Sequence, residues 1–467
     1  MNMLFPTDYL EIWAEASPDA PAMITREGEV SFSSLKSRVS RFANYLEDQG
    51  VGKKSLVAYS VKSELALVVQ LSLMALGATS VRTSSQITEG ATPFSHSLGF
   101  EYKGAKKIEI SDQELKSTSA TRDLRNAQNP KIGLYTSGTT GRPKLVIYEG
   151  QVLVPRIMSP LVASRSASIN LYGPGTMGGF AHPLRALIAG EPSLVMPSYD
   201  LAGLEWLLHK GASIGFTTIS SSVGNIVSMA KAAQRRPIEA SQIRKIYLGG
   251  AKVSERLERI VEKAFPSAKT VSIYGSTEIG VVAMRQLNSS KLPRNCVGLP
   301  LPGVEVEIVD EDSKTVDVGV SGKVKIKTPN VAYYFNTNEA LESFYPGDLG
   351  HLDSQGRLFL EGRESEIINV GGNKIDPAEI DEILLAQPEI LDAAAFGYET
   401  AVGIQAPVAA VVLAPNTDQD ELLERVKKLL PGKAPEGIFV IASIPRNDMQ
   451  KPMRRALAES YQNSTKN

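Results

Sequence analysis

Short apolar segments alternate with amphipathic segments through about the first 280 residues of the chain. An apolar run bounded by turn residues is typical of a buried strand, whereas apolar positions spaced three and four apart are typical of a helix. Strands are predicted at residues 55–59, 132–135, 169–172, 194–196, 214–217, 245–248 and 270–274. Helices are predicted at residues 32–49, 65–78, 201–209 and 254–265, among others. This alternation predicts an α/β domain with mixed, largely parallel sheets.

The pattern changes near residue 295. Residues 303–309 and 322–327 alternate apolar with polar side chains, and residues 357–361 follow a Ser-Gln-Gly turn. Alternation of this kind is typical of antiparallel strands with one solvated face. We therefore predict a small β-barrel-like subdomain at about residues 295–362, which completes a large N-terminal domain over residues 1–363.

A further unit is predicted over residues 364–467. Asp376 is suited to cap a helix, Pro377 to occupy its first position and Glu379 to complete its first turn. Strands are predicted at residues 391–398, 406–413 and 437–442, and a helix at residues 419–430. These elements predict a small α+β C-terminal domain, long enough to fold as a unit.

Composition narrows the functional classes. Lys and Arg total 50 and Asp and Glu total 51, so the formal net charge is −1, and neither a nucleic-acid nor a membrane partner is expected. The single cysteine, Cys296, excludes an intrachain disulfide and a zinc site built on several cysteines. The N-terminus lacks a basic start, and the apolar residues 65–78 are too few to span a bilayer. We therefore expect a cytoplasmic protein.

A loop rich in hydroxyl groups and glycine follows the strand predicted at residues 132–135. Hydroxyls and backbone N–H groups donate to phosphate oxygens, glycine permits close approach, and lysine adds a positive charge. No Ser or Thr follows Lys144, so the loop is not of the Walker A type. An ordinary surface turn is the alternative. The predicted phosphate-binding residues are Thr136, Ser137, Gly138, Thr139, Thr140, Gly141 and Lys144.

This loop resembles the signature phosphate loop of the adenylate-forming superfamily, which contains acyl-CoA synthetases, nonribosomal-peptide adenylation domains and luciferases. Further motifs that resemble those of the family follow in the family's order, from about residue 30 to residue 455. The resemblance implies an N-terminal domain that binds AMP and the acyl group. It also implies a small, mobile C-terminal domain that carries a catalytic lysine.

Residues 274–278, Tyr-Gly-Ser-Thr-Glu, resemble a second motif of the family. The resemblance implies that Tyr274 stacks on adenine beside Gly275, that Thr277 contacts phosphate, and that Glu278 holds Mg²⁺. These roles suit the chemistry, because an aromatic face fits a nucleobase and a carboxylate fits a hard cation. Taken alone, an acid next to a turn is usually a solvated cap.

Three charged residues complete the catalytic set that the resemblance implies. Asp348 matches the acid that binds the ribose hydroxyls, and Arg363 matches the arginine that contacts ribose or phosphate. Taken alone, a Gly-Asp pair is more often part of a turn and an exposed arginine a solvated charge. Lys451 matches the catalytic lysine that bridges the substrate carboxylate and the α-phosphate. Two positions depart from the family pattern: Gln450 replaces the usual glycine, and Ser365 stands at the pivot between the domains, where the family commonly has aspartate or lysine.

Two glycine-containing loops have two possible interpretations each. Gly249, Gly250 and Ala251 resemble the family's loop on the adenine side, and they also suit a tight strand-to-helix turn. Gly371 and Gly372 resemble the loop that lines the pantetheine tunnel, with an ordinary β-turn as an equal alternative.

The acyl pocket is expected near residues 178–180, 220–224, 249–250 and 274–280. Residues 173–182 contain no acid that could pair with a substrate ammonium group, so we expect a carboxylic acid without an α-amino group. His182 is expected to pack or to form a local hydrogen bond.

The resemblance therefore implies a ligase that uses ATP and Mg²⁺ to form an acyl-AMP and then transfers the acyl group to a thiol, most simply that of coenzyme A. One alternative acceptor is the phosphopantetheine of a carrier protein acting in trans, and another is an amine. A second alternative is a non-catalytic nucleotide-binding relative.

Overall fold

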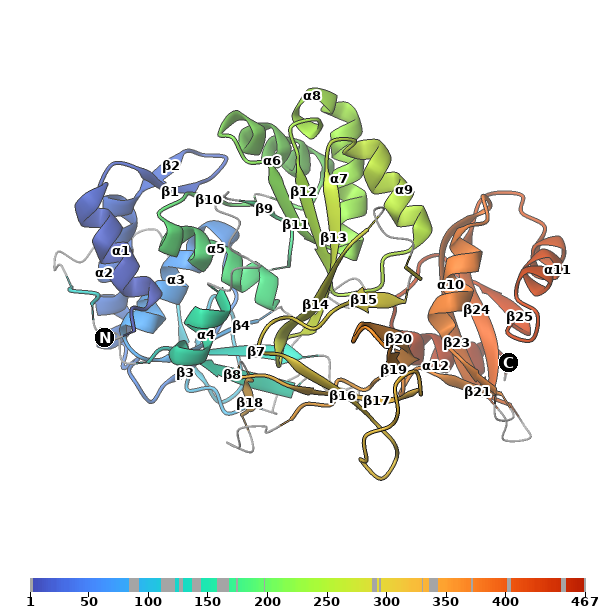
Figure 1. The fold of residues 1–467 in the computed structure, drawn as a ribbon. Helices are drawn as coiled ribbons and strands as arrows, with labels where there is room; N and C mark the ends of the chain where they lie inside the picture. Colours follow the sequence, from blue (N-terminus) through green and yellow to red (C-terminus); the bar gives the residue numbers. More distant parts are fainter. Residues whose placement is uncertain are drawn as a thin grey trace.

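The computed structural model describes residues 3–465 apart from 84–91, 111–121, 126–128, 137–143, 158–167, 174, 197, 288–291, 294, 330, 336–342, 371–372, 401–404 and 447–450. Figure 1 shows a large α/β body that contains the N-terminus and a smaller unit, in orange and red, that contains the C-terminus. The described chain therefore has the mixed α/β architecture that its sequence predicts.

A seven-stranded sheet forms one layer of the large body, in the order β18-β8-β7-β4-β3-β5-β6. Its strands are β3 (Leu56–Tyr59), β4 (Thr79–Arg82), β5 (His96–Leu98), β6 (Lys106–Ile108), β7 (Lys131–Thr136), β8 (Lys144–Glu149) and β18 (Tyr333–Tyr334). Strands β7, β4, β3, β5 and β6 are parallel to one another, whereas β8 and β18 pair antiparallel. Every residue of β3 is buried, as expected for a parallel strand covered on both faces.

A second sheet has the order β14-β13-β12-β11-β9 and is parallel except at β14. Its strands are β9 (Ser168–Asn170), β11 (Thr218–Ser222), β12 (Lys245–Gly249), β13 (Lys269–Ser276) and β14 (Gly280–Gln286). A short third sheet, in the order β10-β1-β2, contains β1 (Pro21–Ile24), β2 (Glu29–Ser31) and β10 (Ser193–Leu194).

Helices pack against these sheets, and their sequences show why they form. In the second helix, Leu35, Val39 and Phe42 lie on one buried face, and Ser31 caps its start by accepting a hydrogen bond from the N–H of Ser34 at 3.2 Å. The helices are α1 (Pro6–Ala16), α2 (Phe32–Asp48), α3 (Ser63–Ala75), α4 (Gly150–Ile157), α5 (Met177–Ala189), α6 (Leu201–Ser213), α7 (Val223–Arg235), α8 (Pro237–Ala240) and α9 (Glu255–Ala264).

An antiparallel sheet forms the predicted β subdomain, in the order β15-β20-β19-β17-β16. Its strands are β15 (Cys296–Gly298), β16 (Glu305–Val309), β17 (Gly322–Lys327), β19 (Asp348–Leu352) and β20 (Leu358–Arg363). Alternate residues point inward, so that Ile308, Val324 and Ile326 are buried in one cluster with Leu358.

The C-terminal unit is built on a sheet in the order β23-β24-β25 and a β21-β22 hairpin. Its elements are β21 (Ile368–Val370), β22 (Asn373–Ile375), α10 (Pro377–Leu385), β23 (Ile390–Glu399), β24 (Gln405–Leu413), α11 (Gln419–Leu429), β25 (Gly437–Val440) and α12 (Arg454–Thr465). Asp376 caps α10 as predicted, with its carboxylate accepting from the N–H of Ala378 at 3.0 Å. Clusters around Ile380 and around Phe396 give this unit its own core.

One predicted strand is wrong. Residues 214–217 were expected to form a strand, but Ile214 is the C-cap of α6 and β11 begins at Thr218. The other predicted elements are confirmed, with boundaries shifted by a few residues. Helix α5 and strand β8 are among the elements that the sequence pattern did not predict.

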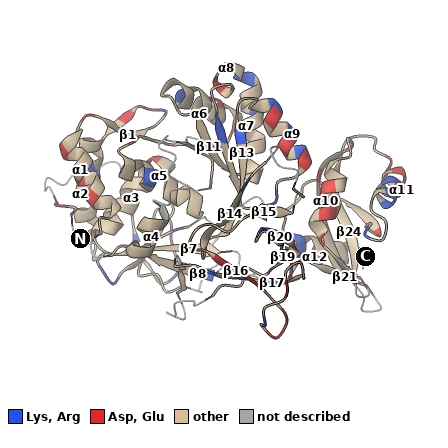
Figure 2. Cartoon of the chain, in the orientation of Figure 1, with Lys and Arg blue, Asp and Glu red and all other residues tan. Residues whose placement is uncertain are grey.

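Charged residues of both signs lie on the outer helices α9 and α11 (Figure 2). Arg259 pairs with Glu255 at 2.7 Å in α9, and Lys427 pairs with Glu424 at 2.8 Å in α11. Exposed pairs of this kind contribute little to stability but keep the local charge balanced. None of the helices in the described chain has the length and apolarity needed to cross a membrane.

Candidate functional site

Asp348 lies at the centre of a cluster that joins the second sheet to the β subdomain. Strand pairing places Asp348 opposite Arg363, and the Arg363 Nε atom lies 3.2 Å from the Asp348 Oδ1 atom. The hydroxyl of Tyr274, at the end of β13, donates to the Asp348 Oδ2 atom at 2.6 Å. Only 6% of Asp348 is exposed. Tyr274 and Arg363, which were predicted from separate motifs, therefore both contact the carboxylate of Asp348.

Burial controls the protonation of this cluster. Burial raises the pKa of the Asp348 carboxyl, while the charge of Arg363, the hydrogen bond from Tyr274 and the charge of Lys451 act in the opposite direction. Burial also raises the pKa of Tyr274 well above its ordinary value, and the Asp348 charge adds to this effect. The Tyr274 phenol therefore remains a hydrogen-bond donor at neutral pH.

Lys451 reaches this cluster from the C-terminal unit. It stands just before α12, next to a β-bridge between Arg446 and Pro452. Burial and the charge of Arg363 lower the pKa of Lys451, and the charges of Asp348 and the carboxylates Glu366 and Glu278 raise it. Lys451 therefore lies near residues of three predicted motifs, represented by Glu278, Asp348 and Arg363.

Lys144 and Glu278 both lie near Tyr334 in β18. The Lys144 Nζ atom lies 5.4 Å from the centroid of the Tyr334 ring, a cation–π distance. Burial raises the pKa of Tyr334, and the charge of Glu278 raises it further. The backbone N–H of Ala332 donates to the Glu278 carbonyl at 2.9 Å, which holds the two segments together. The start of β8 is thereby brought close to Glu278.

The predicted phosphate loop connects β7 to β8. Thr136 pairs with Lys144 across the two strands, so residues 137–143 join the ends of a hairpin. The Thr136 hydroxyl is buried and has no hydrogen-bond partner among the described residues. The predicted site residues outside the described chain are Ser137, Gly138, Thr139, Thr140, Gly141, Gly371 and Gly372, together with Gln450.

The loop at Gly249, Gly250 and Ala251 ends β12, as the sequence predicts. Gly250 has a φ of +92°, a backbone conformation that favours glycine. The hydroxyl of Tyr172 lies against Gly249. A Cβ atom at Gly249 would lie only 2.8 Å from that hydroxyl, so the tyrosine requires glycine at this position.

Tyr172 lies beside the candidate site, and sequence reasoning did not single it out. Its ring lies between Gly249 and the first turn of α5, where a Cβ atom at Gly178 would come within 2.5 Å of the ring. The ring also stacks on His182, with centroids 6.1 Å apart. Tyr172 therefore occupies part of the space in which the acyl pocket was expected. The available signal was an aromatic residue at the end of a predicted strand, directly before the segment expected to line that pocket.

His182 makes local contacts, as its sequence context predicts. Its Nδ1 atom lies 3.2 Å from the hydroxyl of Ser168. Burial lowers the pKa of His182 to about 3, with a smaller contribution from the charge of Arg185. The ring is therefore neutral under physiological conditions.

The segment between Arg363 and the C-terminal unit forms a turn. Ser365 is exposed there, and the N–H groups of Glu366 and Ile367 both donate to the Arg363 carbonyl at 2.9 Å. The exposed serine is consistent with a position that can change its backbone conformation, which is what the resemblance implies for the pivot.

The side chains gathered in this cluster are chemically suited to bind Mg-ATP. A ring that can face a nucleobase, a buried carboxylate, an arginine and a lysine lie together, with the Glu278 carboxylate nearby. One carboxylate suits a Mg²⁺ ion whose remaining ligands are phosphate oxygens and water. Within the described chain, no group of three or more His, Cys, Asp or Glu residues gathers in a metal-binding arrangement.

Comparison with known protein families gives two matches. The model described as "AMP-binding enzyme" matches residues 10–95 and 94–334, and the model described as "AMP-binding enzyme C-terminal domain" matches residues 379–451. Together the two models span most of the chain, including the segments that carry Tyr274, Glu278 and Lys451.

Individual relatives are distant but match over nearly their full length. A 4-coumarate–CoA ligase-like protein from Arabidopsis thaliana is 29% identical over 92% of this chain and 86% of its own length. A 2-succinylbenzoate–CoA ligase from Bacillus cytotoxicus is 26% identical over 95% of this chain and 96% of its own. The solved structure of o-succinylbenzoate CoA synthetase from Bacillus subtilis with its acyl-adenylate intermediate has a TM-score of 0.81 and 24% identity, and covers 98% of each chain. At this identity the structural match establishes a shared fold.

Proposed function

The chain belongs to the AMP-binding enzyme family, within the adenylate-forming superfamily, and from this membership we propose that it joins a carboxylic acid to a thiol at the expense of ATP. A carboxylate oxygen attacks the α-phosphorus of ATP, the bond to pyrophosphate breaks, and acyl-AMP forms. The thiol sulfur then attacks the acyl carbon, and AMP leaves with the bonding electrons. Adenylation is required because a carboxylate is a poor electrophile.

The observation that carries this proposal is the position of Lys451 beside Asp348, Arg363 and Glu278. An ammonium group at this point can hold two anions, the substrate carboxylate and the α-phosphate, in contact. It can also stabilise the charge that develops on the transferring phosphoryl group. The lysine comes from the C-terminal unit and the other three residues from the large body, so the complete site needs both.

We assign the remaining roles by motif and geometry. Tyr274 faces adenine while its hydroxyl is held by Asp348, and Asp348 keeps acceptor capacity for the ribose hydroxyls because each carboxylate oxygen has two lone pairs. Arg363 neutralises Asp348 and contacts the nucleotide. Glu278 would hold Mg²⁺, which would supply positive charge to the phosphate groups of ATP.

The backbone and hydroxyl groups that complete the nucleotide site are assigned in the same way. Thr277 and the loop over residues 136–144 bind phosphate, and residues 249–251 border adenine. We assign Gly371 and Gly372 to the pantetheine path. We also keep the division between the domains after Arg363, and a cytoplasmic location where ATP and coenzyme A are available.

Coenzyme A is the acceptor that we favour, because one of the relatives named above is a coenzyme A ligase and the other is named as like one. A carrier-protein phosphopantetheine or an amine remains the alternative acceptor. Mass spectrometry of products formed with each of the three acceptors distinguishes them, since each product has its own mass.

Acid-dependent exchange of labelled pyrophosphate into ATP tests the first step. A panel of aromatic and aliphatic acids without an α-amino group should include at least one that supports exchange. α-Amino acids should be inactive, because residues 173–182 contain no acid to pair with the ammonium group. Absence of exchange with every acid, in a protein that still binds ATP, would support the non-catalytic alternative.

Replacement of Tyr172 should widen the range of acids. Tyr172→Ala removes the ring between Gly178 and Gly249, so bulky aryl acids should gain at least about 10-fold in kcat/KM relative to small acids. The measurement is pyrophosphate exchange over the acid panel. Tyr172→Phe is the matched control, because it keeps the ring and removes only the hydroxyl that contacts Gly249. An unchanged preference in Tyr172→Ala would place the acyl group elsewhere.

The activity should fall at alkaline pH as Lys451 loses its proton. Burial lowers the pKa of this lysine below its ordinary 10.5, and the charged form is the active one. The kcat/KM for ATP, which reports groups of the free enzyme, should therefore decline as pH rises through a value below 10.5. Lys451→Arg should remove this decline from whatever activity it retains, because a guanidinium stays charged. An identical profile in that variant would assign the decline to another group.

A further inference from the structure

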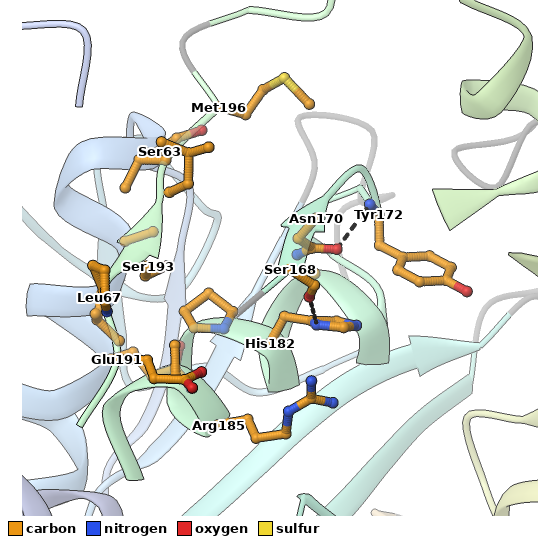
Figure 3. Close-up of a pocket in the computed structure, with 18 of the residues that line it drawn as sticks. Ser63, Leu67, Ser168, Asn170, Tyr172, His182, Arg185, Glu191, Ser193 and Met196 are labelled. Carbon is orange, nitrogen blue, oxygen red and sulfur yellow. Dashed lines mark hydrogen bonds between the residues drawn. The ribbon is translucent and has the colours of Figure 1, made fainter. Parts of the chain in front are cut away.

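A polar cavity lies in the large body, between α3 and β10 on one side and β9 and α5 on the other. It has a volume of about 80 Å³, enough for several water molecules or a small polar group. Figure 3 shows Arg185 and Glu191 at its lower end, His182 and Ser168 along one wall, and Leu67 along the opposite wall.

Two arginines line this cavity, Arg82 at the end of β4 and Arg185 in α5. Neither guanidinium has a hydrogen bond or an ion pair with any group in the described chain. Burial lowers the pKa of both, as expected for charges that are partly withdrawn from water without a close counter-ion. Such a charge is costly unless a partner offsets it.

The acid in the cavity does not neutralise the arginines. Glu191 acts on Arg185 electrostatically but does not approach within ion-pair distance in the described chain. His182 is neutral because burial lowers its pKa to about 3. The cavity therefore combines two positive charges with one negative charge, surrounded by the neutral hydrogen-bonding groups of Ser168 and Asn170.

We propose that this cavity binds the oxyanion group of a small ligand, a carboxylate or a phosphate, through Arg185 and Arg82. A planar guanidinium presents parallel N–H donors that match two oxygens of such a group. The Asn170 side chain and the hydroxyl of Ser168 lie on the same wall, where they can provide further polar contacts.

This site is separate from the nucleotide cluster. Tyr172 lies between them, with its hydroxyl against Gly249 and its ring stacked on His182. Two ligands of the proposed reaction carry such a group. The acid supplies it when it has a second carboxylate, and coenzyme A supplies it through one of its phosphates.

Direct binding tests the site without any turnover. Isothermal titration of the full-length protein with succinate and with inorganic phosphate is carried out with the nucleotide site saturated by AMP. Both probes should bind the wild type, and the Kd should rise at least about 10-fold in Arg185→Gln. Arg259→Ala, which removes an exposed arginine of α9, is the matched control and should bind as the wild type does.

Folding of the variants is checked by thermal melting. Should Arg185→Gln fail to fold, Arg82→Gln takes its place, because Arg82 lies at the other side of the cavity on a different element. Equal affinity of the wild type and a folded arginine variant for both probes would overturn the proposal, and so would the absence of binding to the wild type. Because this readout is binding alone, it stands even if the proposed ligase activity fails.

Kinetics then identify the source of the oxyanion. If the acid supplies it, Arg185→Gln should raise the KM for succinate at least about 10-fold while leaving butanoate unchanged, because butanoate lacks the second carboxylate. If coenzyme A supplies it, Arg82→Gln should raise the KM for coenzyme A and leave pantetheine, which lacks the phosphates, unchanged. Either result supports the oxyanion site, and a variant that alters neither comparison contradicts it.

Discussion

Lys451→Ala is expected to lower acid-dependent pyrophosphate exchange by at least about 10³-fold. The lysine is coupled to Asp348, Arg363 and Glu278, so its charge acts where the nucleotide phosphates and the acid are expected to meet. Alanine removes the cation that we assign to holding the two anions together and to stabilising the developing phosphoryl charge. The loss should appear mainly in kcat, because the stabilisation is strongest in the transition state.

The matched control is Arg455→Ala. Arg455 lies four residues along the chain, pairs with Glu459 on the surface, and has a side chain that is 81% exposed. This variant should retain exchange at close to the wild-type rate, which separates the loss of Lys451 from a general change of charge near α12. Undiminished acyl-AMP formation by Lys451→Ala would remove the catalytic role assigned to this lysine.

Charged neighbours of Lys451 show why its segment could not be interpreted from sequence alone. Arg446 pairs with Asp392 at 2.7 Å, and Arg454 pairs with Asp381 at 2.6 Å. Both arginines thus hold the end of the chain against β23 and α10, whereas basic residues at this spacing usually form a solvated face. The partners come from more than 50 residues away, and no local pattern identifies them.

The residues around Asp348, in contrast, could be predicted through the order of the motifs that resemble those of the family, although a Gly-Asp turn or an exposed arginine alone gives no such signal. Their motifs stand at the ends of strands, and strand pairing then determines which side chains meet. Asp348 starts β19 and Arg363 ends β20, so antiparallel register brings them together. The sequence could not show that the Tyr274 hydroxyl binds Asp348, because that contact joins two different sheets.

Helix α5 was missed for a physical reason. Residues 177–183 contain two glycines and a proline, all of which lower intrinsic helix propensity. The helix forms because Thr176 caps it, accepting from the N–H of Gly179 at 3.1 Å, and because Phe180 and Leu184 are buried on its inner face. Tertiary burial thus overrides the local preference, and with the helix the sequence analysis also missed the cavity that contains Arg185.

Asp348→Ala is the second change with a large expected effect, a rise in the KM for ATP of about 10²-fold. The carboxylate is buried, and it is the group that we assign to the ribose hydroxyls. Hydrogen bonds to a charged acceptor contribute about 1.5–3 kcal/mol each, and alanine removes them all. Arg363 and the Tyr274 hydroxyl also lose their shared partner, so thermal melting must first show that the variant is folded.

A change of nucleotide separates ribose binding from this structural effect. With the wild type, 3′-deoxy-ATP should show a KM about 10-fold above that of ATP, because the acceptor at Asp348 has lost its donor. With Asp348→Ala, the two nucleotides should have nearly equal KM values, since neither can make the contact; this is the logic of a double-mutant cycle. Tyr274→Phe keeps the carboxylate and should keep most of the discrimination. If Asp348→Ala discriminates between the nucleotides as the wild type does, the ribose hydroxyls are bound elsewhere, and Asp348 acts only by positioning Arg363 and Tyr274.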